Sequence, residues 1–280
     1  MKAKNFFRIL LLVTSFLFLS GCQSIILDPK GYISMEQSSL IITSFLMMLL
    51  VVVPVIFMTV FFVWKYSITS KNTKYSPNWD QSHKIEIFIW VLPILIIFFL
   101  ACLSWKSAHR LEPSKPIHSF VKPIEIHVVA LDWKWLFIYP EYNVATINEI
   151  SFPINTPIVF RITSNSVMNS FFIPALGSQI YAMAGMETKL HLLANESGYY
   201  KGFSANYSGR GFSDMKFSVI ATSNKKLFDK WIKNVKKSPY TLNTMKMFHY
   251  IAFYKNKFSV QYFSHVNNDL LNKIIHQFNK

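Results

Sequence analysis

Two long apolar stretches near the start of the chain constrain its fold more than any other feature. Residues 39–64 and 85–105 are nearly all apolar, with Glu86 as the one acid inside the second stretch. A hydrocarbon core of ~30 Å requires about 20 helical residues, so each stretch is long enough to cross a bilayer. We therefore predict transmembrane helices over residues 38–64 and 85–106. Because only 51% of the chain is hydrophobic, a globular domain is expected to accompany this hairpin.

A basic and apolar leader precedes the first stretch. Three basic residues are followed by an apolar run over residues 9–19, which is the pattern of a secretory signal peptide. The sequence Leu-Ser-Gly-Cys at 19–22 resembles the lipobox of bacterial lipoproteins, in which the cysteine is acylated and becomes the new N-terminus. We predict a signal peptide over residues 1–21, a lipid anchor at Cys22 and a periplasmic segment over residues 22–37. An ordinary signal peptide with a chance cysteine is the alternative.

The link between the two stretches, residues 65–84, indicates their orientation. It carries four lysines and one aspartate: Lys65, Lys71, Lys74, Lys84 and Asp80. Positively charged links face the cytoplasm, so both outer ends are expected in the periplasm of a bacterial inner membrane. The predicted acylation of Cys22 on the outer side requires the same topology.

Beyond the hairpin, the pattern changes to the period of two that is typical of strands. In residues 124–130 apolar side chains alternate along the chain, and residues 158–163 repeat the pattern. Short strands between Pro, Gly, Asn and Ser turns predict an antiparallel β-sandwich over residues 107–222. After Thr222, Leu227, Trp231 and Val235 recur at helical spacing, so a helical region is expected over residues 223–280.

The charge and the cysteines restrict the partners and cofactors. The formal net charge is +15, but the lysines are scattered and no nucleic-acid-binding module is present. Attraction to anionic lipid head groups and a compositional drift toward lysine both remain open as explanations. After Cys102 the chain has no cysteine, so the outer domain can hold neither a disulfide nor a thiolate metal site.

Three segments carry a resemblance to a known family. These are Asp-Trp-Lys-Trp at 132–135, Asn-Ser-Phe-Phe-Ile-Pro at 169–174, and Ser-Ala-Asn-Tyr-Ser-Gly-Arg-Gly-Phe-Ser-Asp-Met at 204–215. Together with the lipobox and the hairpin, they resemble subunit II of haem-copper oxidases. The resemblance implies a cupredoxin-like Greek-key sandwich outside the membrane.

In the cytochrome c oxidases of this family, the last two motifs hold the dinuclear CuA centre. At the matching positions this chain has Asn169 and Phe212 in place of histidines, Ser204 and Ser208 in place of cysteines, and Asn206 in place of a glutamate; only Met215 is retained. Soft thiolate and imidazole ligands are what such a copper centre needs, and a serine hydroxyl or a phenyl ring cannot replace them. The pattern therefore resembles the copper-free branch, the cytochrome o-type ubiquinol oxidases. In residues 176–186, Tyr181 also stands where an acid is expected.

Glu86 has both a structural and a functional interpretation. An acid in the first turn of a helix interacts favourably with the helix dipole. An ionisable group at membrane depth is also a functional candidate. The resemblance matches Glu86 to the glutamate proposed to admit protons into one uptake channel. It also matches Trp133 to a tryptophan beside CuA, and without copper we interpret Trp133 and Trp135 as packing aromatics.

These observations predict a non-catalytic subunit of a proton-pumping ubiquinol oxidase. The resemblance implies that haems and active-site copper belong to a large partner subunit, with further small membrane subunits and lipid as the other partners, and that neither cytochrome c nor nucleic acid binds. One rival is a cytochrome c oxidase subunit that carries CuA. Another is a membrane-anchored periplasmic lipoprotein that delivers copper or binds a ligand through clustered Met183, Met186 and Met215.

Overall fold

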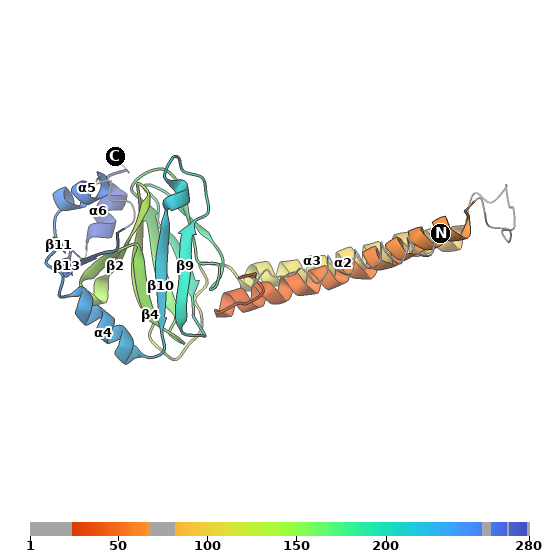
Figure 1. Cartoon of the computed structure of the whole chain (residues 1–280), viewed down its shortest axis with the longest axis horizontal. Coiled ribbons are helices and arrows are strands. Elements are labelled where there is room, and N and C mark those ends of the chain that lie inside the picture. The colour runs from red at the N-terminus through yellow and green to blue at the C-terminus, as the bar shows by residue number, and fades with distance from the viewer. Residues whose placement is uncertain (1–23, 68–81, 254–258, 268, 279–280) are drawn as a thin grey trace, which may run out of the picture.

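A helix hairpin and a β-sandwich make up the computed structural model, which describes residues 24–67, 82–253, 259–267 and 269–278 (Figure 1). Helices α2 (Tyr32–Lys65) and α3 (His83–Arg110) run side by side and away from the sandwich. Among the described residues these two helices are long and apolar enough to cross a membrane, with mean hydropathies of 2.9 and 2.8 over their most apolar windows. Their apolar side chains are exposed all round, as in a membrane-spanning pair.

Both helices extend beyond the predicted spans at the end that meets the sandwich. Helix α2 begins at Tyr32, within the predicted periplasmic segment, because its first turn is built into the domain. The Tyr32 N–H donates to the Leu193 carbonyl at 3.2 Å, and the Ser34 hydroxyl donates to the Ala175 carbonyl at 2.8 Å. Arg110, at the end of α3, pairs with Glu36 of α2. Hydrogen bonds thus fix the first turn of α2 to the domain, and an ion pair joins the two helices at this end.

Two packed sheets form the sandwich, and their bounds follow the predicted alternation. In the described residues, one sheet has the order β12 (Gln261–Phe263), β3 (Val144–Ile147), β2 (Lys134–Tyr139), β1 (Ile124–Leu131), β5 (Ile158–Ser164) and β8 (Thr188–Leu192). The other has the order β4 (Glu149–Pro153), β10 (Lys216–Thr222), β9 (Gly198–Ser204), β6 (Asn169–Phe172) and β7 (Ile180–Ala182). Short 3₁₀ turns η1 (Pro140–Tyr142) and η2 (Phe212–Asp214) lie between strands. The predicted β-sandwich is confirmed.

The sandwich is mixed rather than purely antiparallel, which corrects the predicted strand directions. Strand β1 pairs with β5 in parallel, and β4 pairs with β10 in parallel. Between the two strands of each pair, the chain contributes a strand to the opposite sheet. It then returns and runs in the same direction as the first strand of the pair. Side-chain alternation reports which face of a strand is buried and carries no information about strand direction, so the sequence could not distinguish the two.

Aromatic side chains fill the space between the sheets. Trp135, Phe137, Phe171 and Phe217 are buried, and the rings of Phe171 and Phe217 are stacked with centroids 5.1 Å apart. Trp135 contacts Phe171 edge-on at 5.3 Å. Such pairs contribute about 0.5–1.5 kcal/mol beyond the burial of their area. Contacts between aromatic rings therefore form the centre of the sandwich.

The C-terminal helices predicted for residues 223–280 are confirmed, and short strands that the sequence did not predict lie between them. Helices α4 (Lys225–Val235), α5 (Met245–Phe253) and α6 (Leu270–His276) are present, and the region also forms β11 (Thr241–Leu242), β13 (His265–Val266) and the edge strand β12. Strands of two or three residues are too short to show a period in the sequence.

A second hydrophobic core explains this arrangement. Val129 and Leu131 of β1 and Leu136 of β2 lie on the outer face of the larger sheet, where Phe248 and Ile274 pack against them. The C-terminal region therefore covers a sheet face that would otherwise expose apolar side chains to water.

Helix α4 packs one face against the main core. Phe228, Ile232 and Val235 are buried, whereas Leu227 is exposed. The Asn224 side chain caps the helix by accepting the Leu227 N–H at 2.9 Å.

Glu149 of β4 ties the C-terminal region to the sandwich. Its carboxylate accepts from Trp231 Nε1 at 3.0 Å and from the Tyr262 hydroxyl at 2.6 Å. One side chain thereby joins α4 and β12 to the smaller sheet.

Candidate functional site

The positions that match copper ligands in the family lie on paired strands of the smaller sheet and on the loop that follows them. Asn169 begins β6, and Ser204 ends β9. Strand β6 pairs with β9 so that Phe171 lies opposite Ser204. The loop of residues 205–215 then returns to β10, and the Ser204 N–H donates to the Met215 carbonyl at 3.0 Å. The fold thus brings Asn169, Ser204 and Met215 together, as the motifs predicted.

Neutral hydrogen bonds connect the side chains at these positions. The Ser204 hydroxyl lies 3.2 Å from Asn169 Oδ1 and 3.4 Å from the Asn206 carbonyl oxygen. Asn169 Nδ2 donates to the Val167 carbonyl at 2.9 Å, and Asn206 Nδ2 donates to the Met168 carbonyl at 3.3 Å. Asn169 and Ser204 are buried. Amide and hydroxyl groups therefore join these loops through hydrogen bonds.

The other three positions have different surroundings. Met215 is 1% exposed and packs in the main core. The Phe212 ring contacts the Tyr207 ring edge-on at 5.7 Å. The Ser208 hydroxyl is buried and has no hydrogen-bond partner among the described residues. Phe212 and Met215 thus act as packing side chains.

These side chains do not fit a CuA centre. That centre needs bridging thiolates and imidazoles, and the six positions offer two amides, two hydroxyls, a phenyl ring and one buried thioether. In the part of the chain that the structure describes, no group of three or more His, Cys, Asp or Glu side chains could hold a metal ion. The donor chemistry therefore excludes an electron step through copper at these loops.

Trp133 packs against the loop that replaces the copper-binding segment. It lies at the turn between β1 and β2 with φ of 63°, a conformation that is uncommon for a bulky residue. Gly209 has φ of +124°, and a Cβ atom there would lie 2.7 Å from the Trp133 ring. Gly209 is thus required both for its backbone conformation and for the close approach of this ring. Trp135 is fully buried in the core, so both tryptophans serve as packing aromatics.

The three methionines of the copper-delivery alternative differ in their exposure and do not form one accessible group. Met215 is 1% exposed, whereas Met186 is 54% exposed, and Met183 is half-buried. A delivery site needs accessible donors on one surface. This arrangement disfavours that alternative.

Glu86 lies in the first turn of α3, at the end of the hairpin farthest from the sandwich (Figure 1). Its carboxylate is 3.7 Å from His83 Nδ1, and its side chain is 62% exposed. Its position at a helix N-terminus fits the dipole interpretation. Its exposure also leaves the carboxylate accessible from outside the chain, so the proton-uptake role stays a prediction. Cys22 and most of the link between the helices lie outside the described residues.

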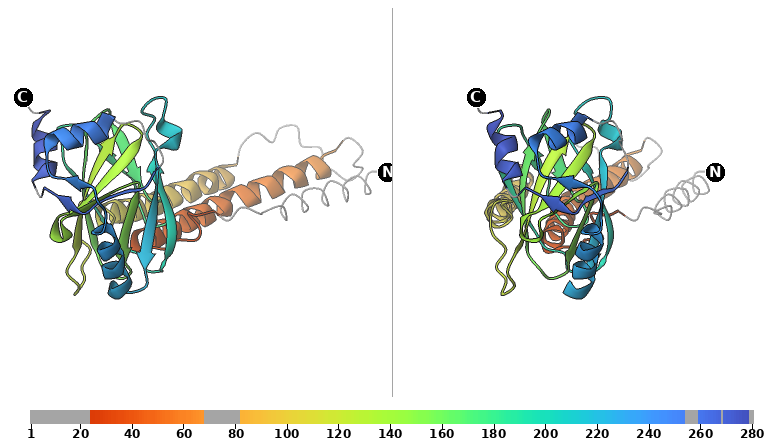
Figure 2. Two further views of the ribbon diagram at one scale, coloured as in Figure 1. Left: turned by 60° about the vertical axis from the view of Figure 1, so that its left-hand side comes forward. Right: turned by 90° about the vertical axis from the view of Figure 1, so that its left-hand side faces the viewer.

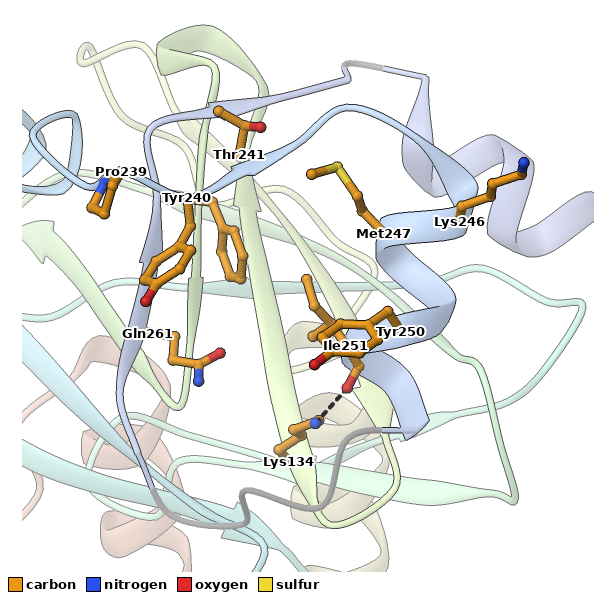
Figure 3. Close-up of a pocket in the computed structure, with 10 residues that line it drawn as sticks. Lys134, Pro239, Tyr240, Thr241, Lys246, Met247, Tyr250, Ile251 and Gln261 are labelled. Carbon is orange, nitrogen blue, oxygen red and sulfur yellow. Dashed lines mark hydrogen bonds between the residues drawn. The ribbon is translucent and has the colours of Figure 1, made fainter.

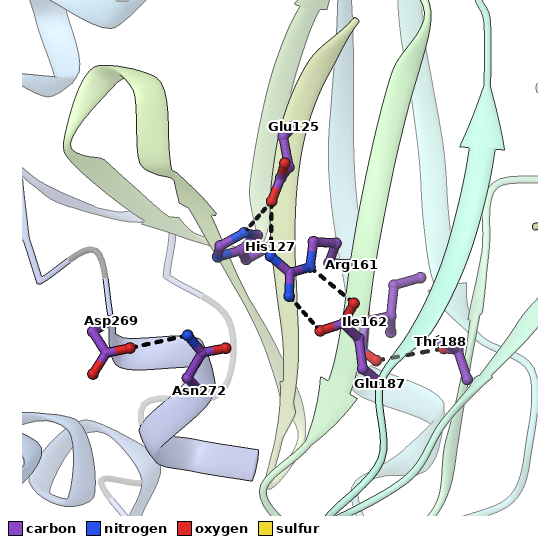
Figure 4. Close-up of polar contacts among 8 residues, drawn as sticks. All are labelled: Glu125, His127, Arg161, Ile162, Glu187, Thr188, Asp269 and Asn272. Atoms are coloured by element: carbon purple, nitrogen blue, oxygen red, sulfur yellow. Dashed lines mark hydrogen bonds and ion pairs between the residues drawn. The ribbon is translucent and has the colours of Figure 1, made fainter. Parts of the chain in front are cut away.

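A charged cluster that the sequence did not predict lies on the outer face of the larger sheet (Figure 4). His127 Nε2 donates to Glu125 at 2.7 Å, and Arg161 bonds to Glu125 at 3.1 Å and to both oxygens of Glu187 at 2.9 and 2.6 Å. Burial lowers the pKa of His127, although Glu125 opposes the shift. Burial alone would raise the pKa of Glu125, but the bonds from His127 and Arg161 outweigh it and lower that pKa. Its members come from three strands or strand ends, so only the alternation of charged residues along β1 could have indicated it.

Comparison with known proteins found a family model and solved structures that are similar to the sandwich. A family model described as "Cytochrome C oxidase subunit II, periplasmic domain" matches residues 141–222, which include all six copper-ligand positions. Among solved structures, the chain resembles the periplasmic domain of subunit II of cytochrome oxidase (CoxB) of Bradyrhizobium japonicum, with 22% identity over 41% of this chain and 94% of that chain and a TM-score of 0.39.

Curated relatives show the family to which the whole chain belongs. The chain is 54% identical to the "Cytochrome bo(3) ubiquinol oxidase subunit 2" of Buchnera aphidicola subsp. Schizaphis graminum, over 98% of this chain and 94% of the relative. It is 58% identical to the protein of the same name from Pseudomonas putida, over 81% of this chain and 72% of the relative. The chain belongs to the family of subunit 2 of bo(3)-type ubiquinol oxidases of the respiratory chain. The resemblance predicted from the three motifs is confirmed.

Proposed function

We propose that this chain is a copper-free, non-catalytic subunit of a proton-pumping oxidase that draws electrons from ubiquinol and passes none through its own sandwich. The hydrogen bonds that join Asn169, Ser204 and Asn206 carry this proposal, because they fill the positions where a cytochrome c oxidase would need copper ligands. The relatives named as ubiquinol oxidase subunits support the choice of donor. Cytochrome c is then not a partner.

The haems and the active-site copper are assigned to a large catalytic partner subunit. The described residues of this chain offer no cluster of metal-binding side chains, and the hairpin presents a continuous apolar surface. Such a surface suits contact with the helices of the large subunit, of further small membrane subunits and of lipid. The rigid junction at Tyr32 and Ser34 would then hold the sandwich at a fixed place over the large subunit.

The proposed location is the bacterial inner membrane with the sandwich in the periplasm. In this topology residues 38–64 and 85–106 cross the bilayer and residues 65–84 face the cytoplasm. The two helices of the structure contain these segments and end together at the sandwich. The lysine-rich link supports the orientation through the positive-inside rule.

Cys22 is proposed as the lipid anchor after removal of residues 1–21. Labelling with a radioactive fatty acid tests this assignment. Cys22→Ser is expected to abolish incorporation of label, whereas Cys102→Ser, which changes an exposed cysteine of α3, should retain it. Label in Cys22→Ser equal to that of the wild type would contradict the assignment.

Glu86 is proposed to collect protons at the cytoplasmic end of α3. Its exposed carboxylate at the far end of the hairpin supports the role. Glu86→Gln is expected to slow oxygen consumption and proton uptake while the haem content stays unchanged. His83→Gln, one helical turn away, is the matched control and should retain wild-type turnover. Unchanged turnover in Glu86→Gln would leave only the helix-end role.

A further inference from the structure

The face of the sandwich opposite the hairpin is strongly basic. In both views of Figure 2 and in Figure 1, the C-terminal region lies on the side of the sandwich away from α2 and α3. Residues 223–280 carry eleven lysines and two aspartates. Six of these lysines lie on or just after α4 and are exposed: Lys225, Lys226, Lys230, Lys233, Lys236 and Lys237. A surface of one sign raises the local concentration of oppositely charged solutes.

A cavity of about 620 Å³ opens on this face, between α5 and the β12 edge of the larger sheet. Figure 3 shows side chains from four segments around it, and its lining includes Lys134, Tyr240, Met247, Tyr250, Gln261 and Phe263. Its size falls in the range of roughly 300–1,000 Å³ that is common for small-molecule sites. Tyrosine rings and Met247 supply apolar walls, and Lys134, Thr241, Lys246 and Gln261 supply polar groups.

Lys134 supplies a buried positive charge to this cavity. It is 3% exposed, and its ammonium reaches from β2 to donate to the Ile251 carbonyl of α5 at 2.5 Å (Figure 3). Burial lowers the pKa of Lys134. An anion that enters the cavity would interact with this ammonium at low dielectric, where charge interactions are stronger than in water.

We propose that this cavity binds a small organic carboxylate whose apolar or aromatic body lies against Tyr250, Met247 and Phe263. The carboxylate pairs with Lys134, and the lysines of α4 attract the anion toward the opening. A buried charge beside apolar walls selects ligands that combine both properties over simple anions and over neutral apolar molecules. The inference is independent of the electron donor proposed above.

The test uses 4-phenylbutyrate as the probe and titration calorimetry on the assembled oxidase in lipid nanodiscs. We expect saturable binding with one site per subunit, with much weaker binding of neutral 4-phenylbutanamide and of inorganic phosphate. Lys134→Met should weaken 4-phenylbutyrate binding by about tenfold or more, the scale of one hydrogen bond to a charged group. Lys230→Met, on the exposed face of α4, should change the affinity less than twofold.

A second variant keeps the test decisive if Lys134→Met impairs assembly. Met247→Trp places a larger ring on an exposed position of α5 that lines the cavity, and it should abolish binding while the complex assembles normally. Three results would each overturn the proposal: equal binding of the acid and the amide, wild-type affinity in either variant, and absence of saturable binding of 4-phenylbutyrate to the wild-type complex.

Discussion

In the helix hairpin the large apolar side chains point outward, whereas in the sandwich they point inward. Phe57 of α2 is 69% exposed, and Phe171 of β6 is fully buried. The sandwich excludes water with its own two sheets and its C-terminal cover, and the hairpin leaves that task to lipid or to partner helices. Apolar composition alone therefore does not determine what surrounds a side chain. The length and period of the pattern do.

The largest expected effect comes from the sandwich core. Phe171→Ala removes a ring that contacts Trp135, Phe137 and Phe217, so it should destabilise the sandwich by about 3–5 kcal/mol. Urea unfolding of the full chain in nanodiscs, followed by tryptophan fluorescence, measures the change. Phe57→Ala in the hairpin is the matched control and should leave the unfolding midpoint of the sandwich unchanged. Equal effects of the two substitutions on the urea midpoint would contradict the difference in burial between the hairpin and the sandwich.

Gly31 lies where the hairpin meets the sandwich, and a substitution there tests how tightly the two regions are joined. A Cβ atom at Gly31 would lie 2.7 Å from the carbonyl oxygens of Leu176 and Leu193, so Gly31→Val must push α2 away from the domain. The expected cost is about 1–3 kcal/mol, as for overpacking elsewhere. The urea midpoint reports it. Gly198→Ala, where the nearest atom would be 3.5 Å away, should cost much less, and a wild-type midpoint in Gly31→Val would contradict rigid docking.

The hydrogen bond at the copper-ligand positions should contribute a smaller amount. Asn169→Ala and Ser204→Ala each remove one partner of a buried contact and should cost about 1–2 kcal/mol. A double-mutant cycle on urea midpoints is expected to give a coupling of about 0.5–1.5 kcal/mol between them. Ser213→Ala, at an exposed position of the same loop, is the control. Additive effects would mean that the two side chains do not act as a pair.

The charged cluster on the outer sheet face predicts the smallest effect, a pH dependence. The pKa of His127 in the folded chain lies below its ordinary value of 6.5, so the unfolded chain binds the proton first. Stability should therefore fall as the pH falls below about 6.5. The lowered pKa of Glu125 adds a further loss below its ordinary value of 4.5.

Urea midpoints at several pH values between 7.5 and 5 measure the histidine contribution. His127→Gln is expected to flatten the profile in this window, whereas His265→Gln, at an exposed position, should leave it as in the wild type. An unchanged slope in His127→Gln would assign the pH dependence to other groups.

The features that the sequence predicted are those with a long or regular pattern. The hairpin followed from two apolar stretches, and β1 and β5 followed from alternation over six or seven residues. The copper-ligand positions could be located because the two motifs keep the spacing of the family although the ligand residues themselves are replaced. The structure then placed Asn169 and Ser204 in contact.

Other features depend on contacts between segments that are distant in sequence. Strand β12 has three residues and forms only because β3 offers an edge. The buried face of α4 could not be chosen from the sequence, since Leu227 and Phe228 both continue an apolar spacing through the helix. Arg161 and Glu187 meet only through the pairing of β5 with β8.

The electron donor of the assembled oxidase can be identified by measuring oxygen consumption. Membranes with and without the gene are supplied either with a soluble ubiquinol or with reduced cytochrome c. We predict gene-dependent oxygen consumption with ubiquinol alone. Gene-dependent consumption with cytochrome c would show that electrons enter without CuA and would contradict the interpretation of Asn169, Ser204 and Phe212.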